Sequence, residues 1–143
     1  MTTPPLLQVP VRSAAELTRR WADVLDPPVF AARSLWLMWL DSDGLSLPLV
    51  VPVDDLPRRP DRATVTGLLL LHDTVVEGRL AGGHVAMALC RPGQPTVTAE
   101  DDAWTAALRE RFGAGLEGTW SLHLAAGGRV VPLVDAPETR GSG

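Results

Sequence analysis

An uninterrupted run of apolar residues, Leu-Trp-Leu-Met-Trp-Leu at positions 35–40, constrains the fold more than any other part of the chain. A strand with one face in water alternates apolar and polar residues, whereas this run has no polar position. Turn residues follow at 41–44, and residues 45–53 return with two prolines, which remove hydrogen-bond donors from a sheet. The sequence therefore predicts a β-hairpin with a central first strand, covered on both faces, and a second strand at an edge or a bend.

The other segments alternate between helical and strand patterns. Ser13 and Glu16 form the capping box of a first helix, which ends at the prolines 27–28. Asp61 is a suitable N-cap for a second helix, and Gly127-Gly128 is a two-residue hairpin turn. After the first hairpin, the expected elements are a helix over residues 61–80, a strand over 84–90, a helix over 98–112, and a hairpin with strands at 119–125 and 129–134. This order predicts an α/β (α+β) fold in which a mixed β-sheet is flanked by helices.

The length of the chain fits one domain. At 143 residues it can bury most of its apolar surface in a single core, and no internal repeat marks a second one. Residues 1–12, which include three prolines, predict a flexible N-terminal arm, and residues 135–143 predict a disordered tail. We therefore expect a single domain over residues 13–134.

The charge distribution argues against a broad surface for nucleic acid. The formal net charge is -4, and all 13 basic residues are arginines scattered along the chain. Nucleic-acid binding needs clustered positive charge that displaces counterions, so this function class is disfavoured. Lysine, isoleucine, asparagine and tyrosine, whose codons are rich in A and T, are absent, which suggests a high-GC bacterial genome.

Cysteine use and hydropathy point to the cytoplasm. Cys90 is the only cysteine, so no disulfide can form within the chain, which fits a reducing compartment. The N-terminus lacks the basic and apolar regions of a signal peptide. The apolar stretches are shorter than the ~20 residues of a membrane-spanning helix. We expect a soluble cytoplasmic protein without membrane contact.

One segment carries a resemblance to a known family. Residues 89–102 read Leu-Cys-Arg-Pro-Gly-Gln-Pro-Thr-Val-Thr-Ala-Glu-Asp-Asp. This segment resembles the RadC-like branch of the JAB/MPN (JAMM) metallopeptidases, in which a strand ends in His-x-His-Pro, a Gly/Pro-rich loop follows, and Ser-x-x-Asp begins a helix. Residues 92–96 correspond to a slightly shorter loop, and Thr98 and Asp101 to the Ser-x-x-Asp, with threonine in place of serine. The resemblance implies a JAB/MPN (cytidine deaminase-like) architecture.

The resemblance also implies a metal site whose ligands this chain lacks. In working members two histidines and the aspartate bind zinc, and a glutamate on an early strand activates the metal-bound water. The histidine positions fall on Leu89, which has no donor atom, and on Arg91, which repels a metal. If the loop gap is placed differently, they fall on Ala88 and Cys90. The early strands contain no glutamate, so only Asp101 is kept. We therefore expect no catalytic residue, metal or cofactor, and a catalytically inactive module that binds a protein partner or forms a homodimer.

The same residues also have ordinary structural explanations. Thr98 and Asp101 fit the first turn of any helix, with Thr98 as the N-cap. Arg91 can form an ion pair with Asp101 across the loop, which contributes about 0–1 kcal/mol if it is exposed. Cys90 fits a small buried side chain better than a nucleophile.

Two other functions stay open. An active hydrolase with a rearranged site would combine Cys90, whose pKa Arg91 could lower, with Asp101 and a histidine brought in by folding. A nucleic-acid-associated accessory role is suggested only by the association of the RadC name with DNA repair. Metal analysis, thiol reactivity and a salt-dependent DNA titration separate these functions.

The apolar stripes predict which large side chains meet. Trp36 or Trp39 should share one core with Met87 and Leu122, whereas Trp21 fits a core and a docking surface equally well. The histidines at 72, 84 and 123 form no spacing motif that would indicate a metal site.

Overall fold

The computed structural model describes residues 11, 13–41, 44–79, 84–112 and 119–134, whose helices and strands follow the predicted order. These elements are α1 (Ala14–Val24), β1 (Ser34–Leu40), β2 (Ser46–Asp54), α2 (Arg62–Arg79), β3 (His84–Cys90), α3 (Ala99–Phe112), β4 (Thr119–Ala126) and β5 (Arg129–Val134). Their bounds agree closely with the sequence-based expectations, because caps, prolines and glycine turns are local signals. No helix in the described ranges is long and apolar enough to cross a membrane.

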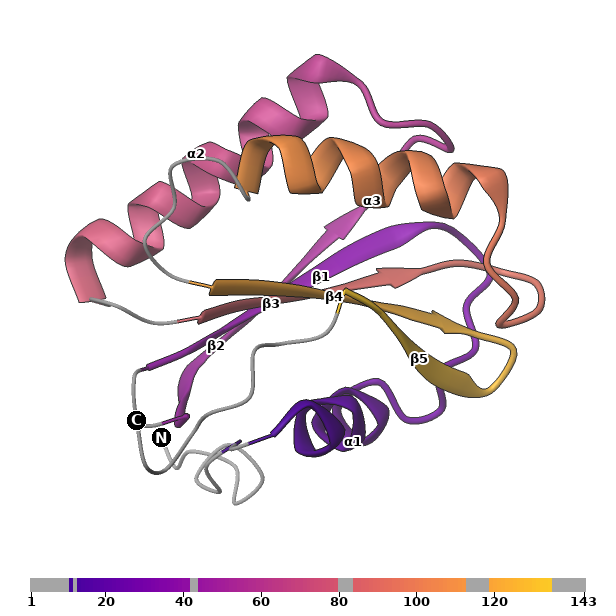
Figure 1. Cartoon of the computed structure of the whole chain (residues 1–143), viewed down its shortest axis with the longest axis horizontal. Coiled ribbons are helices and arrows are strands. Elements are labelled where there is room, and N and C mark those ends of the chain that lie inside the picture. Colours follow the sequence, from indigo (N-terminus) through magenta and orange to yellow (C-terminus); the bar gives the residue numbers. More distant parts are fainter. Residues whose placement is uncertain (1–10, 12, 42–43, 80–83, 113–118, 135–143) are drawn as a thin grey trace.

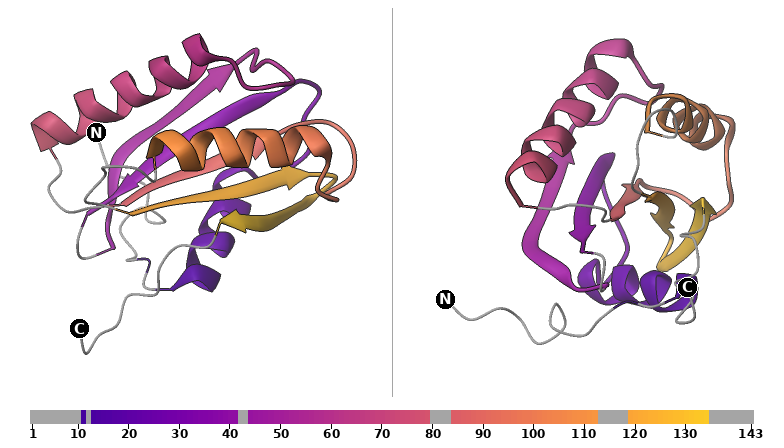
Figure 2. Two further views of the ribbon diagram at one scale, coloured as in Figure 1. Left: turned by 45° about the horizontal axis from the view of Figure 1, so that its top comes forward. Right: turned by 60° about the vertical axis from the view of Figure 1, so that its left-hand side comes forward.

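The strands form one mixed sheet with helices on both faces. The strand order is β2-β1-β3-β4-β5, in which β3 and β4 are parallel and the other neighbours are antiparallel. α2 and α3 cover one face of the sheet, and α1 lies against the other (Figure 1, Figure 2). The predicted mixed sheet flanked by helices is therefore confirmed.

The strand β1 is internal to the sheet and not at an edge, as expected. It pairs with β2 on one side and β3 on the other, and all but one of its residues are buried. The middle position belongs to β3, in which all seven residues are buried. Ala86 and Ala88 of β3 have small side chains and pack in the cluster beneath α1. The number of apolar residues in a segment does not indicate such packing. The proline-containing β2 lies at one edge, as predicted.

Two apolar clusters hold the layers together, one on each face of the sheet. Trp39, Met87 and Leu122 belong to the same cluster, on the face covered by α2 and α3, as expected. The other cluster lies beneath α1 and includes Trp21, which has no exposed surface and is therefore a core residue rather than part of a docking surface. Trp36 packs against this second cluster and is only partly buried.

The N-terminal region differs from expectation at Val11. This residue lies within the predicted flexible arm, yet its side chain is buried and its N–H donates to the carbonyl of Gly44 at 2.8 Å. The chain is thus already packed on the body of the protein two residues before the N-cap Ser13, because an apolar side chain here covers the edge of the α1 cluster. The rest of the arm and the tail over residues 135–143 lie outside the described residues.

Candidate functional site

The residues singled out by the family resemblance lie where β3 ends and α3 begins. β3 and β4 are parallel, so their carboxyl ends meet at one edge of the sheet, where sites in α/β folds commonly form. The loop between β3 and α3 rests against the turn of the β4–β5 hairpin. A Cβ atom on Gly127 would lie 2.8 Å from Cδ of Pro95, so the two loops are in close contact.

Arg91 and Asp101 form a buried, bidentate ion pair across this junction. Nη2 of Arg91 lies 2.7 Å from Oδ2 of Asp101, and Nε lies 2.9 Å from Oδ1. The two side chains are 4% and 0% exposed, respectively. The predicted ion pair is therefore confirmed. The contribution of about 0–1 kcal/mol expected for an exposed pair does not apply, because this pair is buried and bidentate.

The same guanidinium group also fixes the loop. Nη1 of Arg91 donates to the carbonyls of Pro92 at 2.9 Å and Gln94 at 3.0 Å, and Nη2 donates to that of Thr96 at 2.8 Å. Three loop carbonyls thus converge on one side chain. We call Arg91, Asp101 and these carbonyls the arginine clamp.

Thr98 closes the clamp at the start of α3. Its backbone N–H donates to Oδ2 of Asp101 at 2.9 Å, and its Oγ1 accepts from the N–H of Asp101 at 3.2 Å. This reciprocal pair is a helix cap, as the ordinary explanation of Thr98 and Asp101 predicted. Burial alone would raise the pKa of Asp101, but the hydrogen bonds from Arg91 and Thr98 lower it below the usual value, so the carboxylate is charged.

The junction does not fit a zinc ion. Leu89 is buried in the apolar cluster beneath α2 and α3, and Arg91 holds a positive charge against the one carboxylate. If the loop gap is moved, Ala88 and Cys90 take the histidine positions, but both belong to the cluster on the opposite face, beneath α1. In the described part of the chain, no three His, Cys, Asp or Glu side chains are grouped so that they could hold a metal. No step of metal chemistry can therefore be assigned to these residues.

Cys90 is a core residue and not an activated thiol. It has no exposed surface, and its Sγ donates a weak hydrogen bond to the carbonyl of Ala88 at 3.7 Å. Burial raises the pKa of the thiol to about 12, against a smaller lowering by a hydrogen bond with Ser34. The expectation that Arg91 lowers this pKa is wrong, because the guanidinium group is committed to Asp101 and the loop.

The histidines are buried in separate polar contacts that sequence reasoning missed. Nδ1 of His72 accepts from Nε1 of Trp39 at 3.1 Å, beneath α2. On the face beneath α1, Nε2 of His84 lies 2.8 Å from Oγ of Ser121. The ring of His123 lies 2.8 Å from Oγ1 of Thr18, which ties β4 to α1. The alternation in β4 did place His123 on the face opposite the partly buried Trp120, and this was the only signal of the contact.

These contacts do not complete a catalytic group with Cys90 or Asp101. His84 begins β3 and Cys90 ends it, so the two lie at opposite ends of a strand of seven residues. Ser121 has no exposed surface, although its hydroxyl is bonded to a histidine as in a nucleophilic dyad. The arrangement can cross-link the layers, and the side chains of His84, Ser121 and His123 are all buried.

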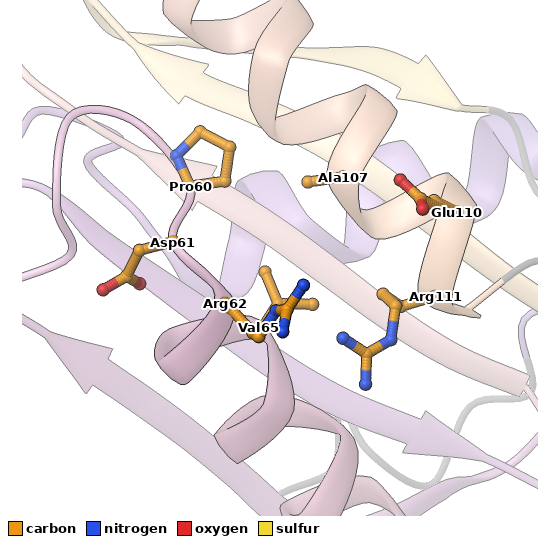
Figure 3. A pocket seen from close by; sticks show the side chains of 7 residues that line it. All are labelled: Pro60, Asp61, Arg62, Val65, Ala107, Glu110 and Arg111. Carbon is orange, nitrogen blue, oxygen red and sulfur yellow. The ribbon is translucent and has the colours of Figure 1, made fainter.

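Two pockets open elsewhere on the described surface. One, of about 240 Å³, lies between the start of α2 and the end of α3 (Figure 3). The other, of about 290 Å³, lies beside β1 and is lined by residues 30–34, Trp36 and residues 54–55. Neither of these two pockets includes a residue of the arginine clamp. Comparison of the chain with protein-family models, with curated proteins and with solved structures found no match.

Proposed function

We propose that this protein is a catalytically inactive module of the RadC-like JAB/MPN type that works by binding another protein. The single observation that carries the proposal is the arginine clamp. Working members of that family hold zinc at the corresponding strand-to-helix junction. Here Arg91 supplies the positive charge, and both carboxylate oxygens of Asp101 accept hydrogen bonds from Arg91 or Thr98.

The clamp supports a binding role because it holds the loop between β3 and α3 in place. A metallopeptidase needs an open coordination position and a carboxylate free to move a proton. Here the carboxylate and the guanidinium are satisfied by the fold, and three carbonyls hold the loop in one conformation. A loop that is fixed in this way offers a partner protein a surface of constant shape, whereas its polar side chains are not free for catalysis. Binding is the simplest use of such a scaffold, and it does not depend on the fold alone.

The experiment has one arm for catalysis and one for binding. The purified chain is assayed for peptidase and isopeptidase activity, with and without added zinc, and we expect no turnover above that of the buffer. The tagged chain is also purified gently from its own cells and analysed by size-exclusion chromatography with light scattering. We expect a complex with one protein partner in a fixed ratio, or a homodimer.

Two results would overturn this proposal. One is zinc-dependent hydrolysis that disappears in Asp101→Asn while the variant stays folded, because that carboxylate would then be a ligand. The other is a strict monomer that captures no protein reproducibly. A thiol-dependent activity lost in Cys90→Ala would instead support the rearranged hydrolase.

A further inference from the structure

The pocket of about 290 Å³ beside β1 lies between the chain that leads into β1 and the loop that follows β2. Ser34 begins β1 and pairs in register with Asp54, the last residue of β2. Beyond this pair, the N–H of Leu56 donates to the carbonyl of Arg33 at 3.1 Å. The backbone therefore holds Arg33 beside Asp54 and Asp55, and all three residues line the pocket. Ser34 also pairs with the last residue of β3, so the pocket lies at the same end of the sheet as the arginine clamp.

The formal charges of this pocket do not cancel. Arg33 contributes one positive charge, whereas Asp54 and Asp55 contribute two negative charges, so one negative charge is left over. Within the described residues, neither carboxylate forms a hydrogen bond or an ion pair, and both aspartates are exposed. Arg58 and Arg59 follow in the same loop but do not line the pocket. A single cationic group would balance the remaining negative charge.

Two aromatic side chains also line the pocket. Phe30 and Trp36 are partly buried and pack against the apolar cluster beneath α1, which holds them in place. A guanidinium group suits both kinds of lining, because its planar face stacks on an indole ring while its parallel N–H donors match carboxylate oxygens. The volume, about 290 Å³, fits one long side chain and not a large cofactor.

From this geometry we propose that the pocket binds the side chain of an arginine in a basic peptide segment of the partner protein. Asp54 and Asp55 bind the guanidinium group, and Trp36 contacts its flat face. An anionic group is disfavoured, because the two carboxylates repel it and Nη1 of Arg33 is buried. The identity of the carrier as a protein rests on the proposed function, whereas the recognition of the cation rests on the pocket itself.

The test uses two peptides that have nearly the same shape and differ in charge. The full chain, labelled with ¹⁵N, is titrated with acetyl-Gly-Arg-Gly-amide and with acetyl-Gly-citrulline-Gly-amide, in which a neutral urea group replaces the guanidinium group. The arginine peptide is expected to shift the indole N–H resonance of Trp36 and the amide resonance of Ser34. Its Kd should lie in the millimolar range and weaken as salt is added. The citrulline peptide is expected to leave these resonances in place.

Variants of the two aspartates assign the binding to the pocket. Asp54→Asn and Asp55→Asn should each weaken binding of the arginine peptide about fivefold, because each removes one carboxylate. Both residues are exposed, and asparagine tolerates the positive φ of Asp55, 55°, as aspartate does, so the variants should fold. Asp73→Asn, at an exposed position on α2 across the sheet from α1 (Figure 1), removes the same charge elsewhere and should leave the affinity unchanged.

Three outcomes with the peptides would overturn the proposal. Equal shifts with the arginine and citrulline peptides would show that the positive charge is not recognised, and unchanged affinity in both aspartate variants would place the binding elsewhere. Tighter binding of acetyl-Gly-Glu-Gly-amide than of the arginine peptide would mean that the pocket selects an anion. If the partner captured from cells binds Asp54→Asn and Asp55→Asn as before, the proposed function stands and the role of the pocket fails. If no partner is captured but the arginine peptide binds as expected, the proposed function fails and the arginine-binding pocket is supported.

Discussion

Asp101 keeps a charged carboxylate in a fully buried position, which a protein tolerates only when the charge is paired and its oxygens are bonded. Arg91 meets both requirements, and it does so from the last residue before the loop that it holds. The guanidinium group thus provides, within the chain, the positive charge that this buried carboxylate requires. The clamp is therefore the residue-scale feature on which the functional proposal depends.

Removing either half of the clamp should be costly. Arg91→Ala leaves the carboxylate of Asp101 buried without a partner and should lower the free energy of unfolding by about 3–5 kcal/mol. The double variant Arg91→Met with Asp101→Leu should cost less than the sum of the two single changes, because no charge is left unpaired. Urea unfolding of the native chain, Arg91→Met, Asp101→Leu and the double variant measures the coupling energy between the two side chains. Arg109→Ala, at an exposed position on α3, the helix of Asp101, serves as the control. If Arg91→Ala lowered the free energy of unfolding no more than Arg109→Ala does, the stabilising role of the clamp would be contradicted.

His84 should make the stability depend on pH in the mildly acidic range. Burial and the neighbouring His123 lower the pKa of His84 from 6.5 to about 4, so between these values the unfolded chain binds a proton more readily than the folded chain. Stability should therefore fall as the pH is lowered from about 6.5 to about 4, by about 2–3 kcal/mol in total. Burial lowers the pKa of His72 as well, which adds in the same direction.

Urea unfolding at a series of pH values measures this dependence. The variant His84→Gln should show a flatter profile over the same range, while His72 keeps its smaller share. Unchanged or rising stability of the native sequence between neutral pH and about pH 5 would refute the buried neutral state of His84.

At the scale of single elements, the hairpin turn between β4 and β5 is shaped by its contact with the clamped loop. Gly127 and Gly128 have φ values of 57° and 84°, which suit a two-residue turn between twisted strands. A Cβ on Gly127 would meet Pro95 at 2.8 Å and the carbonyl oxygen of Gly93 at 3.0 Å, whereas a Cβ on Gly128 would meet nothing within 4 Å. Both glycines thus need a positive φ, but only Gly127 lies against the loop between β3 and α3.

The pair gives a matched test of that contact. Gly127→Ala should cost about 1–3 kcal/mol, because it adds a clash to the strain of a positive φ, and Gly128→Ala should cost less because it adds only the strain. Chemical unfolding of both variants compares them directly. If Gly128→Ala proves the more damaging, the loop does not rest on the turn as described.

The helices and strands could be predicted because their signals are local. Ser13 and Asp61 mark helix starts by the hydrogen bonds that they offer, and the glycine pair at 127–128 marks a turn by its backbone freedom. The ion pair of Arg91 with Asp101 was also predictable, since ten residues separate a strand end from a helix start. Its burial was not, because that depends on how α3 and the neighbouring hairpin cover the junction.

What could not be predicted depends on pairing between distant segments. His84 and Ser121 meet only because β3 and β4 are parallel in one register, and no spacing in the chain records that register. Arg62 and Arg111 line one pocket only because α2 and α3 lie on the same face of the sheet. The middle position of β3 likewise follows from the strand order rather than from its apolar residues.

At the scale of the whole molecule, the sheet should depend on the core beneath α2 and α3. Leu37 has no exposed surface and pairs in register with Met87 of the middle strand. Leu37→Ala should lower the free energy of unfolding by about 2–5 kcal/mol, the usual cost of a large truncation in a core. Leu70→Ala, whose leucine is 62% exposed on α2, should change it by less than about 0.5 kcal/mol. Similar unfolding midpoints for the two variants would show that the cluster is not the core.

We propose that the arginine clamp lies where members of the RadC-like JAB/MPN family hold zinc, and the zinc content of the purified chain tests this. The purified chain is incubated with excess zinc, dialysed against metal-free buffer and measured by elemental analysis. We expect far less than one zinc per chain, because one carboxylate already bonded to an arginine cannot replace the three or four ligands that zinc sites use. About one zinc per chain, lost when Asp101 is changed to asparagine, would contradict it.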